Sequence, residues 1–185
     1  MFIQTEPTPN PSTLKFLPGC EVAGPRLAEF RSPGDAKGSP LAAALFSVDG
    51  VSQVFLGNDF ISVTKNAGEW QHLKPSILGV IMEHFVSGAP MFVETGAGPA
   101  DDDEFYDAAD ADTVDQIKDL LETRVRPAVA GDGGDIKFRG FKDGVVYLAM
   151  KGACSGCPSS TATLKHGIQN LLKHFLPEVR SVEQI

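Results

Sequence analysis

The chain has 185 residues, of which 42% are apolar and 22% charged, a composition typical of one generous globular domain or two small ones. Its formal net charge of −8 argues against binding to nucleic acid, whose phosphates would be repelled. Three cysteines do not make a secreted disulfide framework, and no apolar run approaches the roughly 18 residues of a membrane span. The first residues lack the basic region of a signal peptide and the Arg/Ser-rich character of a transit peptide. We therefore expect a protein of a reducing cytoplasm, with no nucleic-acid and no membrane partner.

The first half of the sequence predicts strands and short helices without the geometry of a catalytic site. Pro7, Pro9 and Pro11 indicate extended or edge-like backbone, because proline cannot donate to a sheet ladder. Cys20 follows a Pro-Gly turn and is interpreted as a bystander thiol. The predicted elements are strands over 1–5 and 14–17, a short helix over 40–48, a hairpin of strands 51–56 and 60–64, and a helix over 75–86 whose Ile77, Leu78, Ile81 and Phe85 share one face.

An acidic stretch separates the two halves. Residues 96–112 contain seven acidic and no basic residues, so charge repulsion and poor apolar content disfavour packing. As a flexible coil this stretch would span roughly 20–25 Å. A solvated loop on a single domain is the alternative. We favour a linker, which gives an N-terminal domain 1–95, an acidic linker 96–112 and a C-terminal domain 113–185.

The second half predicts the order helix, strand, strand, helix, strand. Helical spacing runs from Val114 to Val125, with Thr113 as the N-cap and with Pro127 and Gly131 ending or loosening the helix. The later elements are strands 136–141 and 145–150 around a Lys-Asp-Gly turn, a helix that begins at Pro158 and is stopped by Pro177, and a last strand over 179–185. This order predicts a sheet with helices on one face. The fold class expected for the whole chain is α+β, with two small α/β domains.

Cys154 and Cys157 lie between a predicted strand and a predicted helix, in Lys-Gly-Ala-Cys-Ser-Gly-Cys-Pro-Ser-Ser. A C-x-x-C in this position points both sulfurs the same way, as a metal or a redox reaction requires. Cys157 is expected at or near the helix N-cap, where free amides and the helix dipole favour the metal-binding thiolate. Clusters and structural zinc usually take about four protein ligands. We therefore predict half a metal site, on a surface loop, that a second copy of the chain completes.

This motif has three other interpretations. An inert turn is the minority reading for a cytosolic C-x-x-C. Thioredoxin-like redox chemistry also places C-x-x-C between strand and helix, but only 28 residues follow Cys157, too few for the rest of that fold. Zinc would suit four cysteines from two chains, but it gives the acidic linker no role. An iron–sulfur cluster is the interpretation that we favour.

Two further groups of residues are candidates for a site. The four histidines, His72, His84, His166 and His174, form no ligand spacing with one another or with the cysteines, and the last two are expected at the surface. The Gly-Asp-Gly-Gly-Asp segment at 131–135 lacks the Lys-Ser or Lys-Thr of a phosphate loop. Its glycines are expected to let the segment pack near the cysteine turn.

These motifs together resemble those of Nfu-type proteins, iron–sulfur carriers with a NifU-like C-terminal domain. The C-terminal resemblance runs through Arg126-Pro127, the 131–135 loop and Gly-Ala-Cys-Ser-Gly-Cys-Pro-Ser-Ser at 152–160. The N-terminal resemblance runs through Met-Phe-Ile-Gln-Thr-Glu-Pro-Thr-Pro-Asn-Pro at 1–11 and Leu14-Lys15-Phe16. Outside the acidic stretch it covers nearly the whole chain. It implies a C-terminal domain of the NifU-like α-β-β-α-β type.

The resemblance also implies a function. It implies a carrier, not an enzyme, in which Cys154 and Cys157 of two subunits bind one [4Fe–4S] cluster and deliver it to apo iron–sulfur proteins. The chain would dimerise on cluster binding and receive the cluster from an upstream scaffold, since it lacks the scaffold and ferredoxin-like modules of full-length NifU. The start at Met1 favours the cytoplasm of a bacterium over the mitochondrial matrix of a processed eukaryotic form. The alternative of another class is a thioredoxin-like dithiol oxidoreductase, with Cys154 as nucleophile and Cys157 as resolving thiol.

Overall fold

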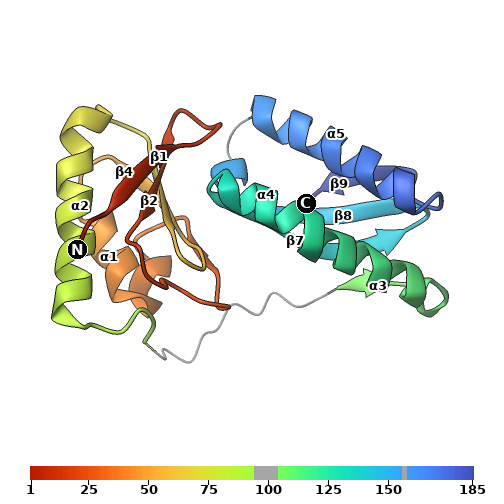
Figure 1. The fold of residues 1–185 in the computed structure, drawn as a ribbon, viewed down its shortest axis with the longest axis horizontal. Helices are drawn as coiled ribbons and strands as arrows, with labels where there is room; N and C mark the ends of the chain where they lie inside the picture. The colour runs from red at the N-terminus through yellow and green to blue at the C-terminus, as the bar shows by residue number, and fades with distance from the viewer. Residues whose placement is uncertain (94–103, 156–157) are drawn as a thin grey trace. The chain divides into compact units, whose positions relative to one another are not determined.

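Two compact units, Met1–Pro99 and Ala100–Ile185, make up the chain in the computed structural model. The structure describes residues 1–93, 104–155 and 158–185, without the side chains of residues 158–160. Each unit has its own sheet and its own helices (Figure 1). The α+β fold class predicted from the sequence is therefore confirmed.

A five-stranded antiparallel sheet forms the N-terminal unit, in the strand order β1-β2-β5-β4-β3. β4 and β5 are the predicted hairpin, and β1 is an edge strand that ends at Pro7. Proline is tolerated at a sheet edge because no second neighbour needs its missing amide. The strands are β1 (Gln4–Pro7), β2 (Thr13–Leu17), β3 (Ala28–Phe30), β4 (Val51–Leu56) and β5 (Ile61–Lys65).

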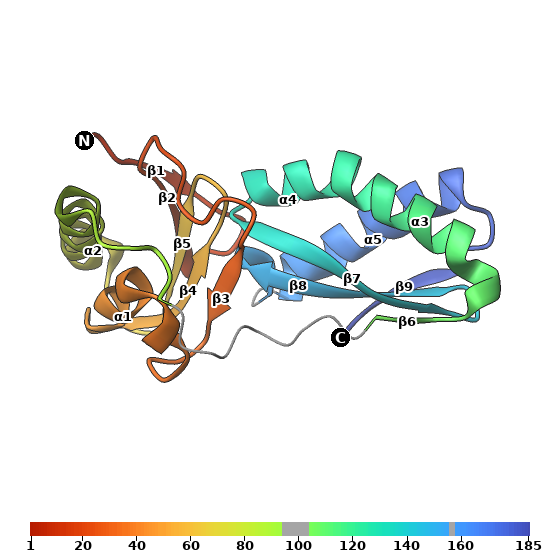
Figure 2. The same ribbon diagram turned by 90° about the horizontal axis from the view of Figure 1, so that it is seen from below.

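The helices α1 (Pro40–Phe46) and α2 (Trp70–Ser87) lie on one face of this sheet (Figure 2). α1 begins at Pro40, as predicted. α2 begins before the predicted start at Pro75, which is inside the helix. Contacts outside the helix hold this first part: the Trp70 indole donates to the Pro11 carbonyl at 3.1 Å, and Leu73 is buried in the core. Tertiary contacts thus outweigh the tendency of proline to begin or break a helix.

The C-terminal unit begins before the predicted boundary at residue 113. Phe105–Tyr106 form the short strand β6, which pairs in parallel with β7, and α3 (Ala111–Leu120) follows. The Phe105 ring lies over Gly140, where a Cβ would clash with it, and its centroid is 5.1 Å from that of Tyr147. These aromatic contacts hold the segment against the sheet, although its acidic composition disfavours packing. Residues 105–112 therefore belong to this unit and not to the expected linker, whose remaining described residue is Glu104; residues 96–103 lie outside the described part of the chain.

A four-stranded mixed sheet, in the order β6-β7-β8-β9, forms the C-terminal unit. β7 (Gly134–Lys142) and β8 (Val145–Gly152) make an antiparallel hairpin, and β9 (Ser181–Gln184) runs parallel to β8. At the hairpin turn Asp143 and Gly144 both have positive φ, 53° and 79°, as a type I′ turn requires. The predicted order helix, strand, strand, helix, strand is confirmed, with β6 added at one edge.

One helical run spans α3, a π-helical turn (Leu121–Val125) and α4 (Arg126–Gly131). Pro127 was expected to end or loosen this helix, because its ring removes the amide that would bond to the residue four positions earlier. The wider π turn ends two residues before the proline, and the run continues to Gly131. The second long helix, α5 (Pro158–Phe175), begins at Pro158 and ends before Pro177, as predicted.

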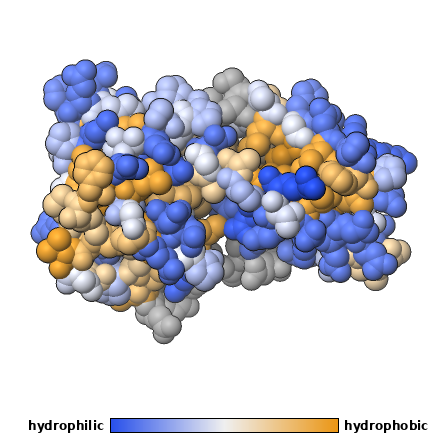
Figure 3. Space-filling view, in the orientation of Figure 1, coloured by the Kyte–Doolittle hydropathy of each residue, from blue (hydrophilic) through white to orange (hydrophobic). Residues whose placement is uncertain are grey.

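The helices of the C-terminal unit cover one face of its sheet, as predicted (Figure 2). Apolar surface gathers between α5 and the α3–α4 run (Figure 3). Leu120, Leu164 and Leu171 are partly buried and pack against the core of this unit. No helix among the described residues is both long enough and apolar enough to cross a membrane. The core beneath is built from alternate positions on β8 and from the inner faces of the helices: Val146, Leu148, Met150, Val114, Ile117, Ile168 and Leu172.

Candidate metal centre

The turn between β8 and α5 carries Cys154. β8 ends at Gly152, whose φ of 69° lies in the left-handed region that glycine adopts without strain. Ala153–Ser155 form a single 3-10 turn, in which the Ser155 hydroxyl donates to the Gly152 carbonyl at 2.9 Å. The Thr161 hydroxyl, in the first part of α5, donates to the Cys154 carbonyl at 3.0 Å. The turn is therefore tied both to the strand before it and to the helix after it.

The glycine-rich segment 131–135 packs directly against this turn, as predicted. The Ala153 amide donates to the Gly133 carbonyl at 3.1 Å. A Cβ added to Gly134 would lie 3.0 Å from the Cys154 Sγ and 2.6 Å from the Lys151 carbonyl oxygen. The absence of a side chain at position 134 therefore lets the sulfur approach the backbone of β7.

Cys154 is packed into the core of the C-terminal unit, and only 5% of the residue is exposed. The expected surface loop is therefore corrected for this residue, since the space that Gly134 leaves admits the sulfur. Burial raises the pKa of the Cys154 thiol to about 11, and the carboxylates of Asp132 and Asp135 act in the same direction. The free cysteine is a neutral thiol at pH 7, and metal binding must release its proton.

The other predicted site residues are placed as follows. Cys157 lies outside the described residues, and α5 begins at the residue after it. Cys20 is an exposed free cysteine in the N-terminal unit, and its interpretation as a bystander thiol stays a prediction. His166 and His174 are exposed, as expected. In residues 1–93, 104–155 and 158–185, no three metal-ligating side chains come together.

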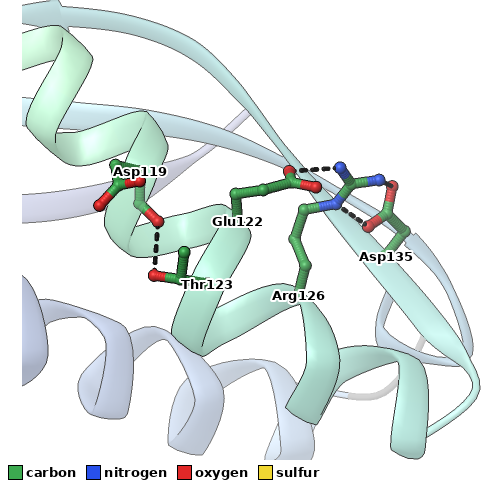
Figure 4. Close-up of polar contacts among 5 residues, drawn as sticks. All are labelled: Asp119, Glu122, Thr123, Arg126 and Asp135. Atoms are coloured by element: carbon green, nitrogen blue, oxygen red, sulfur yellow. Dashed lines mark hydrogen bonds and ion pairs between the residues drawn. The ribbon is translucent and has the colours of Figure 1, made fainter.

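A charged pair beside the turn was not identified from the sequence. The Arg126 guanidinium donates from Nε to Asp135 Oδ1 at 2.8 Å and from Nη2 to Oδ2 at 3.2 Å, and Nη1 reaches Glu122 Oε2 at 2.6 Å (Figure 4). Asp135 is 8% exposed and follows Gly134. The hydrogen bond to Asp135, above all, raises the pKa of Arg126. The i,i+4 spacing of Glu122 and Arg126 was a signal in the sequence, whereas nothing local connected Arg126 with a carboxylate on β7.

The helix that presents Arg126 is irregular at this point. The Thr123 hydroxyl donates to the Asp119 carbonyl at 2.7 Å (Figure 4), and such a bond to the residue four positions earlier bends helices. The π turn, Leu121–Val125, contains Thr123, and π turns occur frequently at functional sites. The side chains of Glu122, in this turn, and of Arg126, the residue that follows it, point toward Asp135 (Figure 4).

Comparisons with known proteins agree on one family. The family model "Scaffold protein Nfu/NifU N terminal" matches residues 3–88, and the model "NifU-like domain" matches residues 117–183. The Drosophila ananassae protein "NFU1 iron-sulfur cluster scaffold homolog, mitochondrial" is 52% identical over 187 residues, which cover 100% of this chain and 64% of that protein. For "NifU-like protein 5, mitochondrial" of Arabidopsis thaliana the identity is 51%, and the match covers 100% of this chain and 68% of that protein.

The human protein with the same name as the Drosophila one is 50% identical over 188 residues, which cover 100% of this chain and 72% of the human protein. The chain thus spans about two thirds of the length of the curated relatives that it matches. Among solved structures, a NifU-like protein from Saccharomyces cerevisiae is 24% identical, with a TM-score of 0.46, and covers 51% of this chain and 86% of its own.

Proposed function

We propose that this chain, which belongs to the Nfu family of NifU-like proteins, carries a [4Fe–4S] cluster between two copies of itself and delivers it to apo iron–sulfur proteins. The observation that carries the proposal is the placement of Cys154, whose sulfur lies against the bare backbone of Gly134 in a turn tied to β8 and α5. The names of the curated relatives as iron-sulfur cluster scaffolds support the same cargo.

The donor set suits iron and sulfide. Cys154 and Cys157 supply two thiolates, and thiolates are the ligands that iron–sulfur clusters take. Because a [4Fe–4S] cluster takes about four of them, two copies of the chain complete the site. Gly134 leaves the backbone of β7 close to the Cys154 sulfur, and Gly133 and Gly152 have the positive φ that glycine adopts without strain.

Delivery is then an exchange of ligands. A thiol of the recipient gives up its proton and binds iron as a thiolate, while one bond from iron to Cys154 or Cys157 breaks and the departing thiolate takes up a proton. Neither iron nor sulfur changes oxidation state in this step, so no reductant is required. Because the two halves of the site belong to separate chains, dissociation of the dimer opens half of the coordination sphere. No covalent bond of the protein is made or broken, so the chain acts as a carrier and not as an enzyme.

The remaining parts of the chain receive supporting roles in this proposal. The N-terminal unit docks the donor or the recipient, an upstream scaffold supplies the cluster, and residues 96–103 link the two units. The word "mitochondrial" in the names of the relatives supports the mitochondrial matrix, rather than the cytoplasm of a bacterium, as the place of action.

A thioredoxin-like dithiol oxidoreductase is less well supported by the same site. Its attacking cysteine must be an accessible thiolate, and such cysteines have a lowered pKa. Burial instead raises the pKa of Cys154 to about 11. Cys154 is therefore suited to binding a cargo that displaces its proton, and poorly suited to attacking a disulfide.

Cysteine substitutions test the proposal. Anaerobic reconstitution of the wild-type chain is expected to give a dimer with about two iron and two sulfide per chain. Cys154→Ser and Cys157→Ser should each abolish stable binding, because two-fold symmetry makes each change remove two of four ligands, while the matched control Cys20→Ser should bind as the wild type does. A stable monomer with four iron atoms, or zinc bound in preference to iron and sulfide, would overturn the proposal. So would a mixed disulfide trapped in only one cysteine variant, with iron content unchanged.

A further inference from the structure

The ion pair between Arg126 and Asp135 has no part in binding or transferring the cargo as described above. The exposed fractions of the two side chains are 33% for Arg126 and 11% for Asp135, so the carboxylate is nearly buried. Two nitrogens of one guanidinium meet two oxygens of one carboxylate, at 2.8 and 3.2 Å. Such a two-point contact fixes orientation as well as distance.

The pair joins the helical run to the strand that supports the cysteine turn. Arg126 is the first residue of α4, and Asp135 is the second residue of β7. The neighbouring Gly134 is the residue whose backbone lies against the Cys154 sulfur, and Gly133 accepts the amide of Ala153. A contact that fixes Asp135 therefore fixes the backbone on which Cys154 rests.

The Asp135 carboxylate is nearly buried and depends on Arg126 for a paired positive charge. A carboxylate as buried as that of Asp135 is strongly destabilising when no cation pairs with it. Glu122 is 65% exposed at its side chain and uses only the third nitrogen of Arg126, so water can replace that contact at little cost. Loss of Arg126 would leave the Asp135 carboxylate to move toward water, and the Gly133-Gly134 backbone would move with it.

We propose that Arg126 is a positioning residue for cluster binding: through its two hydrogen bonds to the Asp135 carboxylate it holds the Gly133-Gly134 backbone against Cys154. The inference rests on the proposed function for its meaning, but it concerns a contact that exists in the apo-protein. It therefore has a readout that does not depend on iron. Alkylation of a buried thiol proceeds through local opening of the structure, so its rate reports how firmly the turn is held.

The experiment compares Arg126→Met with a matched ion-pair control in the full-length apo-protein. Lys118→Met is that control. Lys118 lies in α3, eight residues before Arg126 in the same helical run, and forms an ion pair with Glu104. Its side chain is 37% exposed, close to the value for Arg126. Alkylation by iodoacetamide is followed separately at Cys154 and at Cys20 by peptide mass spectrometry, with the exposed Cys20 as internal reference. Melting temperatures are recorded for both variants, and iron per chain is measured after anaerobic reconstitution.

Arg126→Met is expected to speed alkylation of Cys154 roughly tenfold, in line with the loss of a charged hydrogen-bonded contact, and to lower the iron content. Lys118→Met and Glu122→Gln should leave both quantities at the wild-type level. In Arg126→Met/Asp135→Asn the buried charge is removed, so the melting temperature should recover in part while Cys154 stays reactive. This double variant also replaces Arg126→Met if the single variant does not fold.

Two results would overturn the inference. One is unchanged alkylation of Cys154 in both variants that lack Arg126. The other is an equal increase of the Cys154 alkylation rate in Lys118→Met, which would show that general stability, and not the contact between Arg126 and Asp135, protects the thiol. Failure of the wild-type chain to bind iron and sulfide would instead overturn the proposed function, and the alkylation rates would remain interpretable.

Discussion

Gly134→Ala perturbs the cysteine turn by a single methyl group. The added Cβ would lie 2.6 Å from the Lys151 carbonyl oxygen, 3.0 Å from the Cys154 Sγ and 3.3 Å from the Cys154 amide nitrogen. Two of these three neighbours are backbone atoms, so a rotamer change cannot relieve the contact and the β7–β8 ladder must shift. Overpacking of this kind typically costs about 1–3 kcal/mol. For a unit of this size, a loss of about 2 kcal/mol corresponds to roughly 8–16 °C in melting temperature.

Calorimetry of the apo-protein measures this change, and iron content after reconstitution measures its effect on the site. Gly167→Ala is the matched control, because Gly167 lies in α5 with nothing within 4 Å of its Cβ position. Alanine is the better helix former, so this control should gain about 0.5–1 kcal/mol. Gly134→Ala should lower both the melting temperature and the iron content. A melting temperature and iron content equal to those of the wild type would refute the reasoning that Cys154 rests on bare backbone.

Three further expectations concern other parts of the chain. Proteases that cleave at acidic residues should cut first within 96–103, where trypsin has no site, and should release two fragments that each unfold cooperatively; a first cut elsewhere would count against the linker. The rate of alkylation of Cys154 in the apo-protein should keep rising with pH up to a pH of about 11. Asp132→Asn removes one of the two nearby carboxylates, so in this variant the rate should level off at a lower pH. A wild-type rate that levels off near an ordinary thiol pKa of about 8.5 would be inconsistent with the burial of Cys154. Burial lowers the pKa of His84 below 6.5, so unfolding takes up a proton and stability of the N-terminal unit should fall as the pH drops below 6.5; thermal melts should show this slope in the wild type and not in His84→Phe.

Much of the fold could be predicted because local patterns and tertiary contacts agree. The hairpin of β7 and β8 has alternating apolar residues and a turn whose glycine suits positive φ, and α5 has an apolar stripe between two prolines. The helix boundaries at Pro75 and Pro127 were predicted less well. In both cases packing of the flanking residues holds a helix through a proline, and that packing is not visible in local sequence.

The identity of the site, Cys154 with Cys157, stays a prediction, and the sequence did not indicate the environment in which the structure places Cys154. Spacing alone pointed to Cys154 and Cys157, and glycines at 131–135 pointed to close packing against the turn, which the contact of Gly134 confirms. The burial of Cys154 and the hydrogen bonds from Arg126 to Asp135 depend on how α4 packs against β7. Two residues nine positions apart carry no periodic signal when one lies on a helix and the other on a strand. Their meeting could be seen only in three dimensions.

The parallel pairing of β9 with β8 sets an order of events during synthesis. β9 begins at Ser181, well after Cys154 in the chain, yet it lies beside the strand that leads into the cysteine turn. The amide of Ile185 completes the pairing with the Leu148 carbonyl at 3.0 Å. A ribosome therefore exposes the N-terminal unit, and then both cysteines, before the sheet that buries Cys154 can close. During that interval the thiols are open to stray metals and oxidants, and the waiting time is set by the rate of translation.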